Sequence, residues 1–228
     1  MDSHDLCLFP SHYTLGIPVM YGERYNLIPH SLKTNYYHLF YILKGSDEVT
    51  HLPGWPHSLP SKQYSGFLSS LDTYEFHYWM VESEVDPENA PIIFWFNGGP
   101  GASSLYGLLL ELGPFLLSDE SLTGSEYERT GVPQLLYNPY GWQKVASIVA
   151  ISMPPPVGYS YCNPVGPSAS GNDCGSWNDT STADATYDAI RSFFVKYPEL
   201  KKNELYLAGK RLLTYSLTHS LTHLLTYS

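Results

Sequence analysis

One stretch of this sequence leaves little freedom in how it can fold: an apolar run, then a glycine-rich loop, then a helical pattern. Residues 91–96 (Pro-Ile-Ile-Phe-Trp-Phe) are apolar at consecutive positions, which is typical of a central strand covered on both faces. The loop 97–104 (Asn-Gly-Gly-Pro-Gly-Ala-Ser-Ser) follows directly, and residues 105–112 then repeat leucine with a helical period before Gly113-Pro114. A buried strand that runs through a tight loop into a helix predicts an α/β architecture.

The predicted helix 105–112 has two faces. Its core-facing stripe repeats at i, i+3, i+4 and i+7 and consists of Leu105, Leu108, Leu109 and Leu112. A second stripe holds Gly107 and Glu111, and we expect the missing side chain of Gly107 to leave open space above Glu111. Glu111 is then either a carboxylate beside the glycine loop or an ordinary solvated glutamate.

Further strands and a second helix extend the pattern. Residues 64–68 and 75–81 predict an antiparallel pair, 144–151 and 204–208 predict two more buried strands, and 180–197 predict a helix. Thr180 or Ser181 is expected to cap that helix, and its predicted core stripe is Ala183, Tyr187, Ile190, Phe194 and Tyr197. Strands that alternate with helices predict a mixed, mostly parallel sheet flanked by helices, with ligand sites at the carboxyl ends of its strands.

The glycine loop suits an anion. Consecutive glycines let backbone N–H groups approach a ligand, and Asn97 adds a side-chain amide donor. Such groups bind an anion or a developing oxyanion, although a tight structural turn explains the same residues. The lysine and Ser/Thr pair of a phosphate-binding P-loop is absent, and we predict neither a cofactor nor a metal.

Composition narrows the partners and the compartment. A net charge of -10 argues against nucleic acid and anionic membranes as partners, and no apolar run reaches the length of a membrane span. The first residues lack the pattern of a secretory signal, which indicates a cytosolic chain or an incorrect start. Cys162 and Cys174 flank a loop rich in Pro, Gly, Ser and Asn and either form a disulfide or remain free thiols.

Residues 95–104, together with 111–114 (Glu-Leu-Gly-Pro), resemble the signature of the serine carboxypeptidases, a branch of the α/β-hydrolase fold. Supporting segments include 47–54, 137–142 and 157–161, so the resemblance covers about residues 47–209. It implies a partial α/β-hydrolase fold that is truncated after the third buried strand. The expected organisation is an unassigned segment 1–45, a partial carboxypeptidase domain 46–212 and a four-residue repeat tail 213–228.

The resemblance also implies roles for individual residues. Asn97 and Gly98 would hydrogen-bond the free carboxylate of a peptide, with Glu111 as a protonated acid that donates a further hydrogen bond. Gly99 would supply one N–H of the oxyanion hole, and Trp95 would line the site. The implied partner is a peptide with a free C-terminus, and the implied location is secreted or lysosomal/vacuolar. Asn178-Asp179-Thr180 matches a glycosylation sequon, unless these residues merely cap the following helix.

The sequence departs from the family pattern after Gly209. The family places Glu and then the nucleophilic Ser there, whereas this chain has Lys210 and Arg211. No member of the Ser-Asp-His triad is matched, and His51, His57 and His77 are expected to be core or surface histidines. Catalysis by this chain alone is therefore not expected.

Three hypotheses remain open from the sequence. The first is a serine carboxypeptidase whose sequence is truncated or misread after Gly209, since a Leu-Thr-(Tyr/His)-(Ser/Leu) repeat begins at Leu213. The second is a protein that binds peptide C-termini without cleaving them. The third is a product that does not fold, because half a sheet leaves an unpaired strand edge. Acyl transfer, which uses the same architecture, is a less favoured activity, and the sequence gives no oligomeric state.

Overall fold

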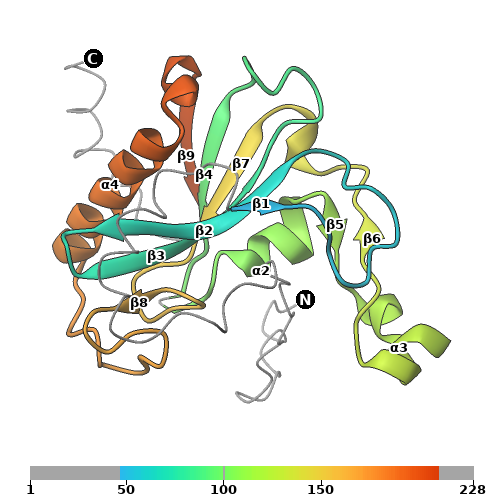
Figure 1. The fold of residues 1–228 in the computed structure, drawn as a ribbon, viewed down its shortest axis with the longest axis horizontal. Helices are drawn as coiled ribbons and strands as arrows, with labels where there is room; N and C mark the ends of the chain where they lie inside the picture. The colour runs from blue at the N-terminus through green and yellow to red at the C-terminus, as the bar shows by residue number, and fades with distance from the viewer. Residues whose placement is uncertain (1–46, 100, 211–228) are drawn as a thin grey trace, which may run out of the picture.

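The computed structural model describes residues 47–99 and 101–210 (Figure 1). Its main sheet contains β1 (Glu48–Val49), β2 (Gln63–Ser70), β3 (Tyr74–Val81), β4 (Ile92–Phe96), β7 (Ser147–Ile151), β8 (Tyr161–Cys162) and β9 (Leu205–Gly209). A small second sheet pairs β5 (Phe115–Leu116) with β6 (Leu136–Tyr137). The helices are α2 (Leu105–Gly107), the π-helix η3 (Leu108–Leu112), α3 (Ser125–Thr130), α4 (Asp179–Lys196) and the 3₁₀ turns η4 (Asp119–Leu122), η5 (Trp142–Lys144) and η6 (Pro198–Lys202).

The main sheet has the order β1-β2-β3-β7-β4-β9, with β8 paired to β3. The predicted antiparallel hairpin is confirmed as β2 and β3, and the predicted mixed sheet flanked by helices is observed. Parallel pairing is confined to β7, β4 and β9, so within the described residues antiparallel pairs outnumber parallel ones. The expectation of a mostly parallel sheet is therefore too strong here, because the hairpin and its neighbours are all joined antiparallel.

The sheet is covered on both faces, as the apolar run 91–96 predicts (Figure 1). Between the sheet and α4 lies one hydrophobic core, which includes Tyr78, Phe94, Ile190 and Phe193. On the other face a second core includes Trp79, Trp95, Leu108 and Leu112. Neighbours such as Phe94 and Trp95 belong to different cores because successive side chains of a strand point to opposite faces.

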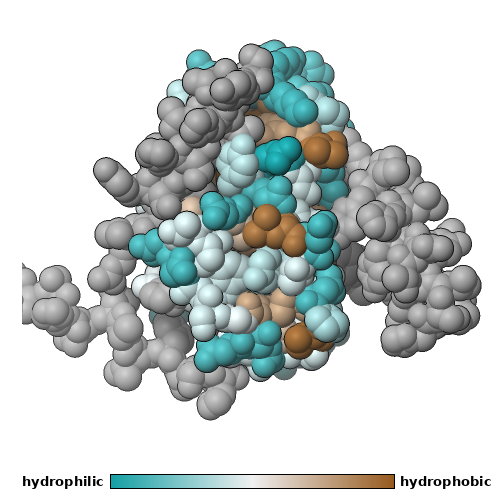
Figure 2. All heavy atoms as spheres, turned by 90° about the vertical axis from the view of Figure 1, so that its left-hand side faces the viewer, coloured by the Kyte–Doolittle hydropathy of each residue, from teal (hydrophilic) through white to brown (hydrophobic). Residues whose placement is uncertain are grey.

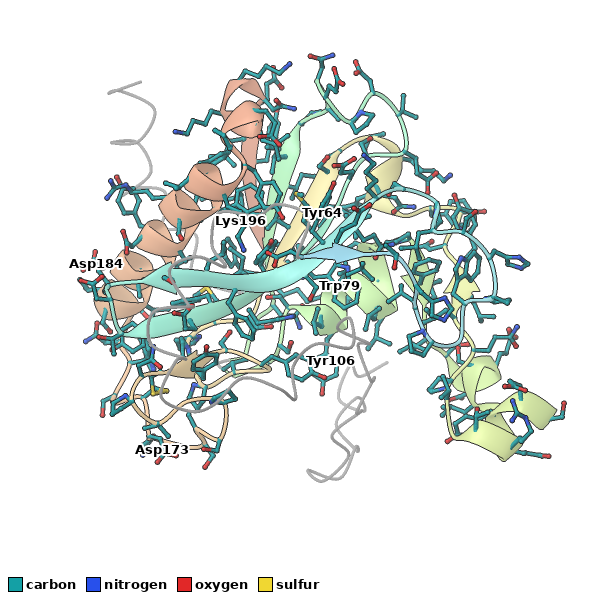
Figure 3. The ribbon with its side chains drawn as sticks, in the orientation of Figure 1. Tyr64, Trp79, Tyr106, Asp173, Asp184 and Lys196 are labelled. Atoms are coloured by element: carbon teal, nitrogen blue, oxygen red, sulfur yellow. A yellow bond between two sulfur atoms is a disulfide. The ribbon has the colours of Figure 1, made fainter. Side chains whose placement is uncertain are left out.

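A polar contact joins α4 to the sheet. Lys196 lies near the end of α4 and points toward β2 (Figure 3), where its Nζ contacts the Asp47 carboxylate and donates to the carbonyl oxygen of Phe67 at 3.3 Å. The Tyr78 hydroxyl donates to the same carboxylate at 2.7 Å. These contacts hold α4 against the sheet that also contains the parallel strands β7, β4 and β9.

Two helix predictions need correction. The N-cap of α4 is Asn178, whose Oδ1 accepts from the Ser181 N–H at 2.9 Å, and the predicted caps Thr180 and Ser181 lie inside the helix. Tyr187 and Phe194 are only partly buried, and the buried stripe instead includes Ala185, Thr186, Ala189 and Phe193. The predicted helix 105–112 begins as one α-helical turn and continues as a π-helix from Leu108, yet Leu108 and Leu112 of the expected stripe are buried, with Leu105 and Leu109 partly buried.

The strand predicted at 204–208 is observed as β9, but it is not fully buried. Tyr206 is exposed and the neighbouring residues are half-buried, because β9 is the last strand of the described sheet. The side of the molecule that carries α4 shows separate hydrophobic residues among polar ones (Figure 2). None of the helices in the described ranges is long and apolar enough to cross a membrane.

Of the two alternatives for Cys162 and Cys174, the structure has the disulfide, with the two Cα atoms 5.5 Å apart. It closes the loop that runs from β8 toward α4. The predicted segments 1–45 and 213–228 lie outside the described residues, so the proposed division of the chain stays a prediction.

Candidate functional site

The candidate site lies where β4 and β9 end. These strands are parallel, Phe96 is paired with Gly209, and the Lys210 N–H donates to the carbonyl oxygen of Phe96 at 3.1 Å. Asn97 and Lys210 therefore leave the sheet next to each other. This is the edge where ligands bind in parallel sheets, and the sequence places the glycine loop there too.

Asn97 is held by its backbone and by its side chain. Its backbone N–H donates to Ser104 Oγ at 3.0 Å, which closes the loop on itself. Its Oδ1 accepts from Trp95 Nε1 at 3.0 Å. With the oxygen used by Trp95, the amide NH₂ of Asn97 is the end of the side chain that points away from the indole, and it can donate to a ligand.

Trp95 is buried and packs against Trp142, with ring centroids 5.7 Å apart in an edge-to-face arrangement. Gly107 lies against the Nε1 edge of this indole. A Cβ at Gly107 would lie 2.1 Å from Trp95 Nε1 and 2.8 Å from Asn97 Oδ1. The expected open space above Glu111 is therefore wrong: the space beside Gly107 is occupied by Trp95 and Asn97.

Gly98 and Gly99 place the loop backbone at the surface of this edge. Gly98 is half-buried and Gly99 is exposed, with φ +148° at Gly99. A Cβ at Gly99 would lie 2.7 Å from the Gly101 nitrogen, so only glycine allows the chain to fold back this tightly. The backbone nitrogens of Gly101 and Ala102 therefore lie next to Gly99, and backbone N–H groups in such a loop suit an anion.

Glu111 lies on η3, one turn beyond Gly107, and its carboxylate accepts a hydrogen bond from Lys210 Nζ. The two side chains are 37% and 55% exposed, respectively. Asn138 anchors the end of the helix, since its Nδ2 donates to the Gly113 carbonyl oxygen at 2.9 Å. Glu111 is thus a carboxylate beside the loop, and its partner within the described residues is a lysine that the sequence reasoning did not assign to the site.

The structure brings together Trp95, Asn97, Gly98, Gly99 and Glu111, and it adds Lys210. The roles inferred for the first five stay predictions, and Arg211 lies outside the described residues. Among the histidines, His77 is buried in the core and His51 and His57 are exposed, as expected. The sequence signal for Lys210 is its position directly after β9, at the carboxyl end of a strand, where ligand sites are expected.

The fold resembles that of a solved carboxypeptidase. A prohormone-processing carboxypeptidase from Saccharomyces cerevisiae, Kex1(delta)p, matches with a TM-score of 0.65 and 20% sequence identity, over 81% of this chain and 40% of that one. This likeness places the chain among proteins of the α/β-hydrolase fold. At the level of sequence, the family model of the serine carboxypeptidases matches residues 53–211. The chain belongs to the serine carboxypeptidase family.

Individual relatives with similar sequences support this family membership. The lysosomal protective protein of Mus musculus is 42% identical over 164 residues, which is 72% of this chain and 31% of that protein. Serine carboxypeptidase 1 of Hordeum vulgare is 36% identical over 165 residues, 72% of this chain and 30% of that protein. The chain therefore spans about a third of the length of the curated relatives it matches.

Proposed function

We propose that this chain binds peptides by their free C-terminal carboxylate at the carboxyl ends of β4 and β9. The observation that carries the proposal is the meeting of an amide donor, a glycine-rich backbone and a lysine at one edge of the sheet. Asn97 follows β4 and Lys210 follows the neighbouring strand β9, and both are accessible to solvent. Backbone N–H groups, a primary amide and an ammonium are all donors, which suits a ligand that only accepts hydrogen bonds.

Each residue of the site has a proposed part in this binding. Asn97 Nδ2 and the Gly98 N–H donate to the carboxylate, and the Trp95 indole positions Asn97. Glu111 completes the site next to Lys210. Gly99 lies one residue further along the loop, where its N–H would face the carbonyl group of the terminal peptide bond as half of an oxyanion hole.

We further propose that residues 1–228 bind such peptides without cleaving them. The family match extends to residue 211, where the pattern calls for the nucleophilic serine and this chain has arginine. A guanidinium is not a nucleophile at any pH that proteins tolerate. What remains after loss of the nucleophile in serine hydrolases is binding and oxyanion stabilisation alone.

Calorimetry with a matched pair of ligands tests the binding. We expect N-acetyl-phenylalanyl-leucine to bind the full chain about tenfold or more tightly than its C-terminal amide, because the amide replaces an ionic acceptor. Chromatography of the same mixtures should detect no free leucine. Equal affinity for acid and amide would contradict the proposed carboxylate site, and release of leucine would contradict the absence of cleavage.

We also propose passage through the secretory pathway toward a lysosomal or vacuolar compartment. The Cys162–Cys174 disulfide supports an oxidising environment, and a lysosomal protein is among the relatives. Asn178 is exposed and its cap hydrogen bond uses Oδ1, which leaves Nδ2 for a glycan. The chain made in eukaryotic secretory cells should therefore lose mass on treatment with an N-glycosidase, and Asn178→Gln should remove this change. An unchanged mass in the unmutated chain would exclude glycosylation at Asn178.

A further inference from the structure

At position 210 the family pattern has an acidic residue, whereas this chain has a lysine, which carries the opposite charge. Its backbone is fixed by the hydrogen bond to Phe96, so its side chain starts level with Asn97. From there Nζ contacts the Glu111 carboxylate on η3. The cation therefore comes from the residue directly after β9 and the carboxylate from η3.

The exposure of this pair decides what it can do. Glu111 and Lys210 are 37% and 55% exposed, and an ion pair that is open to water contributes little net free energy. A second carboxylate can therefore share or take over the ammonium at low cost. A lysine ammonium has three N–H donors, and Glu111 Oε1 accepts from Nζ without using all of them.

We propose that Lys210 is a specificity-determining residue that binds the C-terminal carboxylate of the ligand through its ammonium, with Glu111 holding that ammonium in place. This inference rests on the proposed function and names the Lys210 ammonium as the group that makes binding depend on the negative charge of the ligand. A lysine ammonium stays charged throughout the acidic and neutral range. Carboxylate recognition by this chain consequently does not require a protonated acid in the site, in contrast to the role that the family resemblance gives Glu111.

The inference predicts how binding depends on pH. In the unmutated chain, the preference for N-acetyl-phenylalanyl-leucine over its amide should be the same within about threefold at pH 5 and pH 7.5, because recognition by an ammonium needs no protonated acid. Lys210→Met should reduce this preference about tenfold or more at pH 7.5, since it removes the cation and leaves the Glu111 carboxylate near the ligand.

Two further variants separate charge from structure. Lys210→Arg should keep most of the preference at both pH values, because it keeps the positive charge. Lys201→Met is the matched control: Lys201 is exposed on η6, before the amino end of β9, and its substitution should leave binding unchanged. Near-ultraviolet circular dichroism of each variant verifies that the fold is retained.

The outcomes distinguish this inference from the proposed function. If the unmutated chain binds acid and amide equally, the carboxylate site itself is wrong. If it prefers the acid and Lys210→Met retains or strengthens that preference, the site stands and the role of Lys210 is overturned. A preference that appears in the unmutated chain only at pH 5 also overturns it, because a protonated acid would then be the recognising group.

Discussion

Replacing Gly107 by alanine is expected to destabilise the chain by about 1–3 kcal/mol and to abolish most of its preference for a peptide carboxylate. Gly107 has helical backbone angles, with φ -59° and ψ -43°, and at such a position alanine normally stabilises a helix by roughly 0.5–1 kcal/mol relative to glycine. Here the added Cβ would lie 2.1 Å from Trp95 Nε1 and 2.8 Å from Asn97 Oδ1. The sign of the change is therefore opposite to the ordinary one.

The strain cannot be relieved by a small movement of a flexible group. Trp95 is buried and packed against Trp142, so its ring moves only if the core beside it moves. Displacing the indole would also break its hydrogen bond to Asn97, the residue proposed to donate to the ligand. The stability change and the loss of binding thus share one cause.

Urea unfolding and calorimetry with the peptide acid and amide measure the two effects. Tyr106→Ala is a suitable control, because Tyr106 neighbours Gly107 in sequence but is exposed and points away from the sheet (Figure 3). Alanine favours a helix more than tyrosine does, and apart from this gain Tyr106→Ala should change the free energy of unfolding by less than about 0.5 kcal/mol. If Gly107→Ala stabilises the chain and binds the acid as before, the placement of Trp95 and Asn97 against the helix is incorrect.

The elements that the sequence predicted well are those whose pattern is local. The apolar run 91–96 identified a strand with both faces covered, and β4 indeed contributes Phe94 and Trp95 to different cores. The hairpin of β2 and β3 followed from two β-rich runs separated by a short polar connection. Such patterns depend on side chains within one element, so a single sequence contains them.

What the sequence did not predict depends on how elements meet. The leucine period of 105–112 fits an α-helix, and nothing in it indicates the π-helix that begins at Leu108. Gly107 was expected to border empty space, because its contact with Trp95 comes from the neighbouring strand and is absent from the helical pattern. The proportion of antiparallel strands was likewise set by the order of β3 and β7 in the sheet.

The candidate site shows the same division. Asn97, Gly98 and Gly99 were predicted from a contiguous motif, and the structure places them at the expected edge of the sheet. The contact between Lys210 and Glu111 joins residues far apart in the chain, and it became apparent only when β9 was placed beside β4. The effect of a substitution within a family motif therefore depends on the residue that the new side chain contacts, and the motif alone does not identify that residue.

His77 gives the chain a second measurable property, a dependence of stability on pH. It is 3% exposed on β3, its ring lies edge-to-face with Phe67 and Tyr159, and its Nε2 lies 3.0 Å from Ser65 Oγ. Its Nδ1 has no hydrogen-bond partner among the described residues. Burial lowers the pKa of His77 from 6.5 to about 4, because a charged imidazolium would lose its hydration without gaining a partner.

The direction of the effect follows from proton binding. Between pH 6.5 and 4 the unfolded chain binds a proton at this histidine and the folded chain does not, so stability falls as the pH falls. Above pH 6.5 His77 does not lower the free energy of unfolding. Below it, the expected loss of that free energy is about 2 kcal/mol at pH 5 and up to about 3 kcal/mol near pH 4. For a protein proposed to reach an acidic compartment, this is a substantial part of a typical folding free energy.

A carboxyl group adds to the loss at lower pH. Burial alone would raise the pKa of Glu84, but hydrogen bonds from Gln143 and Lys144 outweigh it and lower that pKa below 4.5. Glu84 thus contributes stability that is present above pH 4.5 and is lost as the pH falls below that value. The interval from pH 6.5 to 5 is therefore the one in which the effect of His77 is separated from that of Glu84.

Urea unfolding of the full chain at pH 7.5, 6 and 5 measures the effect of His77. His77→Gln keeps a polar group opposite Ser65 but does not titrate, so its free energy of unfolding should lose about 2 kcal/mol less than that of the unmutated chain between pH 7.5 and 5. His51→Gln, at an exposed histidine, should keep the pH dependence of the unmutated chain. If His77→Gln and His51→Gln show the same dependence, His77 is protonated in the folded chain, and the buried imidazole must have a proton acceptor or water beside Nδ1.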